Sequence, residues 1–237
     1  SQIEIFEALA GNGASPQLGH MALLVGADGD KLSKRLGSLS IESLRDEEGF
    51  EPMAITSLLA KIGTSDPVEA RESVEVLASE FDFAKLSRTP ARFDPAELAR
   101  LNARLVHAMD YAEVKDRLAD LGADGGEAFW AAVRPNLERV RDVIEWKTLV
   151  EGPIEPVIED ADYAAAAAAL LPEGDYTLET WGEWTAAIKA ETGRKGRDLF
   201  KPLRLALTGQ ERGPEMDQLL MLIGRERAKK RLSGETA

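Results

Sequence analysis

The chain has 237 residues, of which 44% are hydrophobic and 30% charged, so it can bury a sizeable core in one or two domains. Because it has no cysteine and only two histidines, the sequence excludes a disulfide framework and a thiolate metal site, and we expect no metal centre. The net charge of −13 excludes a uniformly basic surface, but not the local basic face that contact with phosphates needs.

No apolar run approaches the roughly 18 residues that a membrane span requires, and no N-terminal signal pattern is present. We therefore expect a cytoplasmic monomer that makes no contact with a membrane. The lack of cysteine suits a reducing compartment. The chain begins at Ser1 inside a predicted helix, and we interpret it as a portion of a longer protein.

The N-terminal part of the chain alternates short helical patterns with turns. Apolar spacing predicts a helix over 1–10, ended by Gly13 and Pro16, and a short buried strand over 21–25 with a turn at 26–30. Residues 83–93 are expected to be irregular. Further helices are expected over 41–48, 53–62, 67–81 and 95–109.

The remaining residues also have helical periodicity, and the start and stop signals are strongest near the end. Gly193 and Gly209 each follow a helical pattern, Pro214 opens the next one, and Gly224 ends it. Hardly any segment other than 21–25 alternates as a strand does, so the chain is predicted to be mainly α. The expected helices cover 111–121, 125–145, 160–171, 178–191, 202–208, 214–222 and 225–232.

Positive charge is concentrated in two windows, 194–204 and 225–231. Each window holds five cations and one acid, a net charge of +4. Such windows are typical of phosphate-binding faces, and equally of solvated helix C-termini, so both interpretations stay open. The cations of the first window are Arg194, Lys195, Arg197, Lys201 and Arg204.

A basic pentapeptide, Lys31-Leu32-Ser33-Lys34-Arg35, follows the predicted strand and its Asp-Gly turn. Lysines on a short flexible loop suit a triphosphate, because a mobile ammonium can follow the charge that grows on a leaving pyrophosphate. The alternative for so short a motif is a solvated surface loop.

Several segments, in the right order, resemble glutamyl-tRNA synthetases of class I. The pentapeptide resembles the KMSKS loop of that class, with Arg35 in place of its final serine, and Thr192–Gly209 (TGRKGRDLFKPLRLALTG) resembles the family's C-terminal signature. One departure is Thr56–Leu58, where the family usually has Asn-Tyr-Leu. The other matching segments are Gly19–Gly26, Phe50–Ala54, Phe93–Pro95, Gly213–Glu215 and Leu222–Gly224.

The resemblance implies the C-terminal portion of an enzyme that joins glutamate to tRNA through glutamyl-AMP, using Mg-ATP. It implies the end of a catalytic domain over 1–37, a helical region contacting the tRNA stem over 38–95, and an α-helical cage binding the anticodon over 96–237. Because the nucleotide-binding fold with its His-x-Gly-His motif is missing, this portion alone is predicted to be inactive and to hold no tightly bound cofactor.

By the same resemblance, Lys34 would contact the ATP phosphates with Lys31 assisting, and Ser33 and Arg35 would complete the ATP-binding loop. Arg139 is a candidate reader of an anticodon base. Trp181 and Trp184 are expected either to stack on bases or to lie in the core. The expected tRNA contacts in the basic window are Arg194, Lys195, Arg197, Lys201 and Arg204.

Three alternatives accompany this prediction. Within the family, a paralogue would charge tRNA-Gln instead of tRNA-Glu, and the sequence does not decide between them. Outside it, an all-α acidic chain also fits a non-catalytic scaffold that binds a protein. A short synthetase-like enzyme that modifies tRNA-Asp is disfavoured, because that family lacks a C-terminal anticodon domain.

Overall fold

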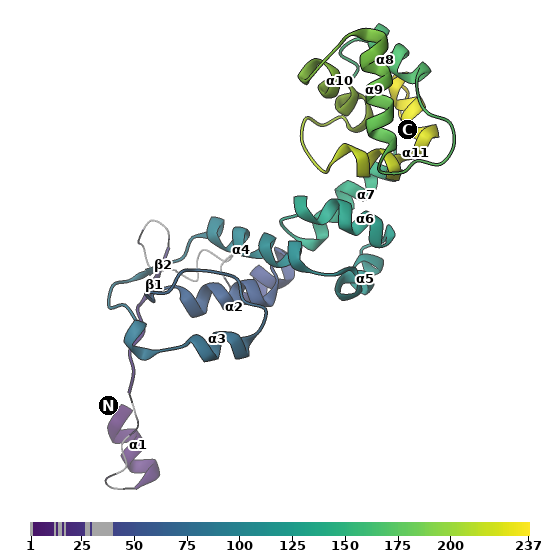
Figure 1. Ribbon diagram of the computed structural model, residues 1–237. Coiled ribbons are helices and arrows are strands. Elements are labelled where there is room, and N and C mark those ends of the chain that lie inside the picture. Colours follow the sequence, from purple (N-terminus) through teal and green to yellow (C-terminus); the bar gives the residue numbers. More distant parts are fainter. Residues whose placement is uncertain (1, 12, 14–15, 17, 27–28, 30–39) are drawn as a thin grey trace. The chain divides into compact units, whose positions relative to one another are not determined.

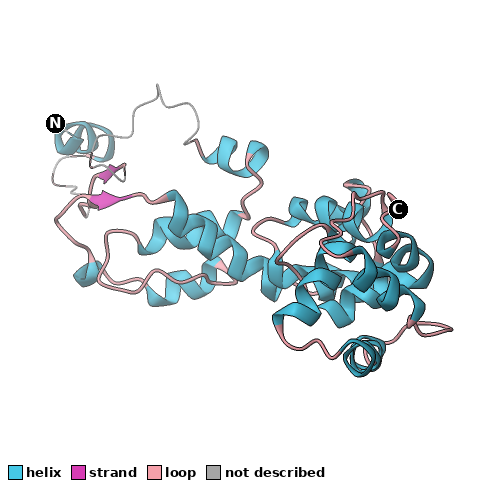
Figure 2. Ribbon diagram, turned by 90° about the horizontal axis from the view of Figure 1, so that it is seen from above, coloured by secondary structure: helices cyan, strands magenta, loops and turns pink. Residues whose placement is uncertain are grey.

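The computed structural model describes residues 2–11, 13, 16, 18–26, 29 and 40–237. The chain divides into two compact units, Ser1–Leu101 and Asn102–Ala237, and the division falls inside helix α4 (Pro95–Ala108) (Figure 1). Helices dominate the described residues, as predicted (Figure 2). Every helix in this described part is too short or too polar to cross a lipid bilayer.

The first unit contains a small parallel pair of strands. β1 (Leu24–Val25) pairs with β2 (Ala91–Arg92), with Leu24 opposite Ala91. Val25, Phe50, Leu58 and Phe93 belong to its buried residues. The other elements of this unit are α1 (Gln2–Ala10), the π-helical turn η2 (Ser43–Glu47), α2 (Pro52–Lys61), α3 (Val74–Glu80) and the 3-10 turn η3 (Phe83–Lys85).

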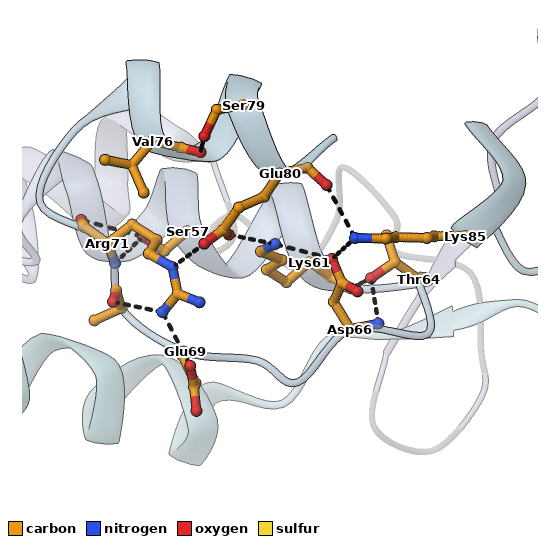
Figure 3. Close-up of polar contacts among 11 residues, drawn as sticks. Ser57, Lys61, Thr64, Asp66, Glu69, Arg71, Val76, Ser79, Glu80 and Lys85 are labelled. Carbon is orange, nitrogen blue, oxygen red and sulfur yellow. Dashed lines mark hydrogen bonds and ion pairs between the residues drawn. The ribbon is translucent and has the colours of Figure 1, made fainter. Parts of the chain in front are cut away.

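A charge network ties α2 to the segments that follow it (Figure 3). The buried Lys61 Nζ lies 2.6 Å from Glu80 Oε2 and 3.0 Å from Asp66 Oδ2. Lys85 contacts the same Asp66 oxygen at 3.0 Å, and Arg71 contacts Glu80 at 2.9 Å. The contacts of the Lys61 ammonium with the carboxylates of Glu80 first and Asp66 second raise the pKa of Lys61, and the cations lower the pKa values of both acids.

The second unit is a helical assembly around one continuous core. Its largest fully buried side chains include Trp130, Phe129 and Trp184, and α11 packs against α8, α9 and α10 (Figures 1 and 2). The elements are α5 (Tyr111–Asp120), α6 (Gly126–Val133), η4 (Arg134–Asn136), η5 (Val140–Asp142), α7 (Val143–Glu151), α8 (Ala161–Ala169), α9 (Thr180–Thr192), α10 (Arg197–Thr208) and α11 (Met216–Leu232).

Several sequence-based boundaries were wrong, among them that of the strand expected over 21–25, which is only Leu24–Val25. The single helix expected over 125–145 is broken into α6, two 3-10 turns and α7, because Pro135 has no N–H to continue the helical ladder. The helix expected over 67–81 begins only at Val74, where the Ser73 hydroxyl accepts from the N–H of Val76. α10 begins five residues before the expected 202 and carries Pro202 inside it.

The predicted glycine stops are confirmed. Gly193 and Gly209 end α9 and α10 in the left-handed conformation, with φ of 70° and 68°. Gly224 has φ 75° and ψ 166°, which kinks α11 where we expected one helix to end and the next to begin. Gly193 and Gly224 directly precede Arg194 and Arg225, the first residues of the two basic windows.

Candidate nucleic-acid interface

The pentapeptide loop lies outside the described residues. The positions of Lys31, Ser33, Lys34 and Arg35 are therefore not described, and their roles stay predictions. The described element that precedes the loop is the strand β1. Gly63, with φ 76°, passes close to it, since a Cβ there would lie 3.3 Å from the Cβ of Ala22 and 3.1 Å from that of Ala91.

The five cations of the 194–204 window have different surroundings. Arg194 is held by an ion pair with Asp160, and its guanidinium carbon lies 4.0 Å from the centre of the Tyr163 ring. The N–H of Tyr163, followed by Arg194, lowers the pKa of Asp160. Burial raises the pKa of Tyr163 to about 12. Arg194 therefore joins α8 to the end of α9, which is a structural role.

Lys195 lies on the turn between α9 and α10, and Arg197 is the first residue of α10. Both side chains are exposed and form no ion pair or hydrogen bond with a described residue. Gly193 and Gly196 flank Lys195 with φ of 70° and 54°, conformations that side-chain-bearing residues rarely adopt. The turn and the start of α10 thus present Lys195 and Arg197 to solvent, available to an anionic ligand.

Lys201 and Arg204 project from α10. Lys201 Nζ lies 3.1 Å from carboxylate oxygens of both Glu159 and Glu211. Arg204 is half-buried and donates a 2.7 Å hydrogen bond to the carbonyl of Pro214, and burial lowers the pKa of Arg204. Arg204 therefore fixes the loop between α10 and α11 while its side chain stays at a cavity wall.

A cavity of about 730 Å³ lies between α9, α10 and the start of α11. Three of the predicted cations line it, namely Arg197, Lys201 and Arg204, and so do the aromatic rings of Trp181 and Phe200. The two ring centres are 6.2 Å apart with planes tilted by 35°, and Phe200 is 44% exposed. The other lining residues are Glu211, Arg212, Glu215, Met216 and Asp217.

Sequence reasoning missed Arg212 and the acidic members of this cavity. Phe200 lay within the recognised signature without being singled out. The signal that could have identified Glu211 and Arg212 was the short charged segment between Gly209, which ends α10, and Pro214, which precedes α11. Trp184 belongs to the core, fully buried with its indole N–H donating to the carbonyl of Ala167 at 2.9 Å.

The other candidates do not line this cavity. Arg139 precedes η5, where its N–H donates to Asp142 at 2.7 Å and its guanidinium lies 3.7 Å from the Glu138 carboxylate. In the second basic window, Arg231 is fully buried, so that window does not form one solvated basic face. Among the described residues, no group of three or more acidic or histidine side chains forms a potential metal site.

Comparison with known proteins places this cavity inside a recognised domain. Residues 131–234 match the family model described as "Anticodon binding domain". The chain is 62% identical over its whole length to "Glutamate--tRNA ligase 1" of Maricaulis maris and 55% identical to "Glutamate--tRNA ligase 2" of Methylorubrum populi. It covers 53% and 52% of these proteins, so the chain spans about half the length of the curated relatives it matches.

A solved structure supports the fold. The crystal structure of a glutamate tRNA ligase from Elizabethkingia meningosepticum, in complex with its amino acid, superposes with a TM-score of 0.76 at 22% identity. The match covers 97% of this chain and 53% of that one. The resemblance and the mainly α fold expected from the sequence are thus confirmed. The three-part division at 37 and 95 and the individual site residues stay predictions.

Proposed function

We propose that this chain, which corresponds to a C-terminal portion of the glutamate–tRNA ligases, binds tRNA, and that its second unit holds the single-stranded anticodon. The observation that carries the proposal is the cavity between α9, α10 and α11. It combines aromatic rings with cations and lies within the segment matched to an anticodon binding domain.

The chemistry of the cavity suits an unpaired base with its phosphates. Single-stranded RNA is bound by stacking its bases on aromatic side chains while a positive groove follows the backbone. Phe200, exposed at the cavity, offers a ring face, with Trp181 beside it. Arg197, Lys201 and Arg204 supply positive charge on the same walls.

The whole enzyme would join glutamate to tRNA-Glu, or to tRNA-Gln in a paralogue, with Mg-ATP as the energy source. In that reaction we assign Lys34 and Lys31 of the pentapeptide to the ATP phosphates, with Ser33 and Arg35 beside them. This chain alone should not form glutamyl-AMP. Glutamate-dependent pyrophosphate exchange by the purified chain would contradict that expectation.

The test is direct binding. Labelled transcripts of tRNA-Glu and tRNA-Gln are titrated with the chain at two salt concentrations, and we expect affinity to fall as salt rises, because bound phosphates release counterions. An Arg139→Met variant should change the ratio of the two affinities if Arg139 reads a base edge. Absence of binding to either transcript at low salt would refute the proposal and favour a protein-binding scaffold.

A further inference from the structure

Lys201 occupies an unusual position among the cavity cations. Its side chain is 27% exposed, and its ammonium group is already shared between two carboxylates, Glu159 and Glu211, each at 3.1 Å. Of these two acids only Glu211 lines the cavity. An RNA phosphate that contacts Lys201 from the cavity therefore lies beside the Glu211 carboxylate.

The fold sets the position of Glu211. Arg204 holds the loop between α10 and α11 by its bond to the carbonyl of Pro214. At the other end of the loop, the hydroxyl of Thr208 accepts from the N–H of Gln210 at 3.1 Å. Glu211 follows Gln210 directly, so the anchored backbone of this loop holds the Glu211 carboxylate close to Lys201.

The charges around Glu211 are mostly positive. Besides Lys201, Arg197 and Arg212 also favour its ionised form, and together they lower the pKa of Glu211. The facing groups from the packed elements are Glu159 before α8, Glu215 and Asp217 at the start of α11, and Arg204 on α10. At neutral pH Glu211 is thus an anion set among cations that would otherwise face the ligand.

We propose that Glu211 is a tethered competitor for the RNA phosphate at Lys201, a residue that limits how strongly this cavity attracts polyanions. This inference rests on the proposed binding of RNA to the cavity. Binding then exchanges one carboxylate for one phosphate at Lys201. Because the displaced carboxylate stays attached to the protein beside the phosphate, it offsets the charge that Lys201 neutralises, so fewer of the cations condensed on the RNA are released and Lys201 adds little to the salt dependence of binding.

The proposal predicts the behaviour of Glu211→Gln. The amide keeps the size of the side chain and removes its charge, so affinity for a labelled anticodon stem-loop RNA should rise about two- to fivefold at low salt, the range of an exposed ion pair. The slope of log K against log salt should steepen by up to about 0.7, because Lys201 without its Glu211 partner neutralises one RNA phosphate more fully and releases the cations condensed on it.

Two controls separate this mechanism from a general charge effect. Glu191→Gln makes the same chemical change at an exposed position of α9 that forms no ion pair with a described residue and does not line the cavity. It should leave affinity and slope nearly unchanged. In a Lys201→Met background, Glu211→Gln should lose most of its gain. Thermal melting of each variant verifies that the second unit is folded.

The outcomes distinguish the inference from the proposed function. Wild-type binding with equal gains from Glu211→Gln and Glu191→Gln, or with a full gain in the Lys201→Met background, would overturn the role of Glu211 and leave RNA binding intact. No change on Glu211→Gln would also overturn it. Failure of both wild type and Glu211→Gln to bind the RNA would overturn the proposed function and this inference together.

Discussion

Lys61 in the first unit and Lys201 in the second each bridge two carboxylates, but they differ in access to solvent. The Lys61 side chain is 5% exposed, whereas that of Lys201 is 27% exposed and stands at a cavity. Both lysines have pKa values raised by contact of the ammonium group with carboxylates, first with Glu80 for Lys61 and first with Glu159 for Lys201. A buried ion pair of this kind stabilises the fold. In a partly exposed one, a carboxylate can be replaced by an anionic ligand.

The largest effect should come from removing the buried lysine. Lys61→Met leaves Glu80 and Asp66 without their shared cation, and breaking a buried pair in this way should destabilise the first unit by about 3 kcal/mol. All four tryptophans lie in the second unit, so fluorescence does not report this change. Hydrogen exchange of the backbone amides in α2 and α3 does report it. Lys85→Met, which removes a more exposed partner of Asp66, should have a clearly smaller effect.

The next effect concerns the aromatic wall of the cavity. Phe200→Ala should weaken anticodon stem-loop binding by about 1–3 kcal/mol, or by a factor of about 5 to 150, if a base stacks on the ring. Phe200→Leu keeps apolar contact without a π face and should recover little. Leu178→Ala, an exposed apolar residue outside the cavity, is the matched control and should bind normally. Normal binding by Phe200→Ala would move the stacking site elsewhere.

The cations of the basic window should separate into two groups. Replacing Lys195 and Arg197 by Ala should flatten the salt slope by about 1.4, or about 0.7 for each phosphate that the protein no longer neutralises. Arg194→Met should leave that slope unchanged and lower the melting temperature, because Arg194 is engaged with Asp160 and Tyr163. A slope that flattens equally in both variants would mean that Arg194 also faces the RNA.

The smallest effect is on pH dependence in the first unit. The folded-state pKa values of Asp66 and Glu80 are lowered, first by Lys61 in each case, so their contribution to stability is present above the ordinary carboxyl pKa near 4. It is lost as pH falls through the lowered values. Hydrogen exchange of α2 should therefore be insensitive to this network between pH 7 and 5, after correction for intrinsic exchange, and lose protection below about pH 4. In Lys61→Met the acid-induced loss should be smaller.

Local signals in the sequence predicted much of the helical framework, including the stops at Gly193, Gly209 and Gly224. They failed where partners come from far along the chain. The short strand β2 exists because β1 lies beside it, and two residues alone carry no strand periodicity. Pro135, by contrast, was visible, and the 125–145 helix should have been ended there.

The same limit applies to the prediction of the candidate site residues. The sequence placed Arg197, Lys201 and Arg204 in one window, and the cavity brings them together. It could not tell that Arg194 and Lys201 would meet Asp160 and Glu159, which lie 34 and 42 positions away. Charge counting identifies cations, but only packing decides which of them are already neutralised.

Arg231 is a cation that solvent does not reach. Its guanidinium donates to the carbonyl oxygens of Leu207 and Gly152 at 2.8 and 3.1 Å and to the main-chain oxygen of Ala237 at 2.7 Å, and burial lowers its pKa to about 10. Dicarbonyl reagents that label arginine should therefore modify the exposed Arg197 and Arg212 rapidly and spare Arg231 in the native protein. Arg231 should be labelled only when the second unit unfolds. The rate at which label appears on Arg231 would therefore report the unfolding of that unit.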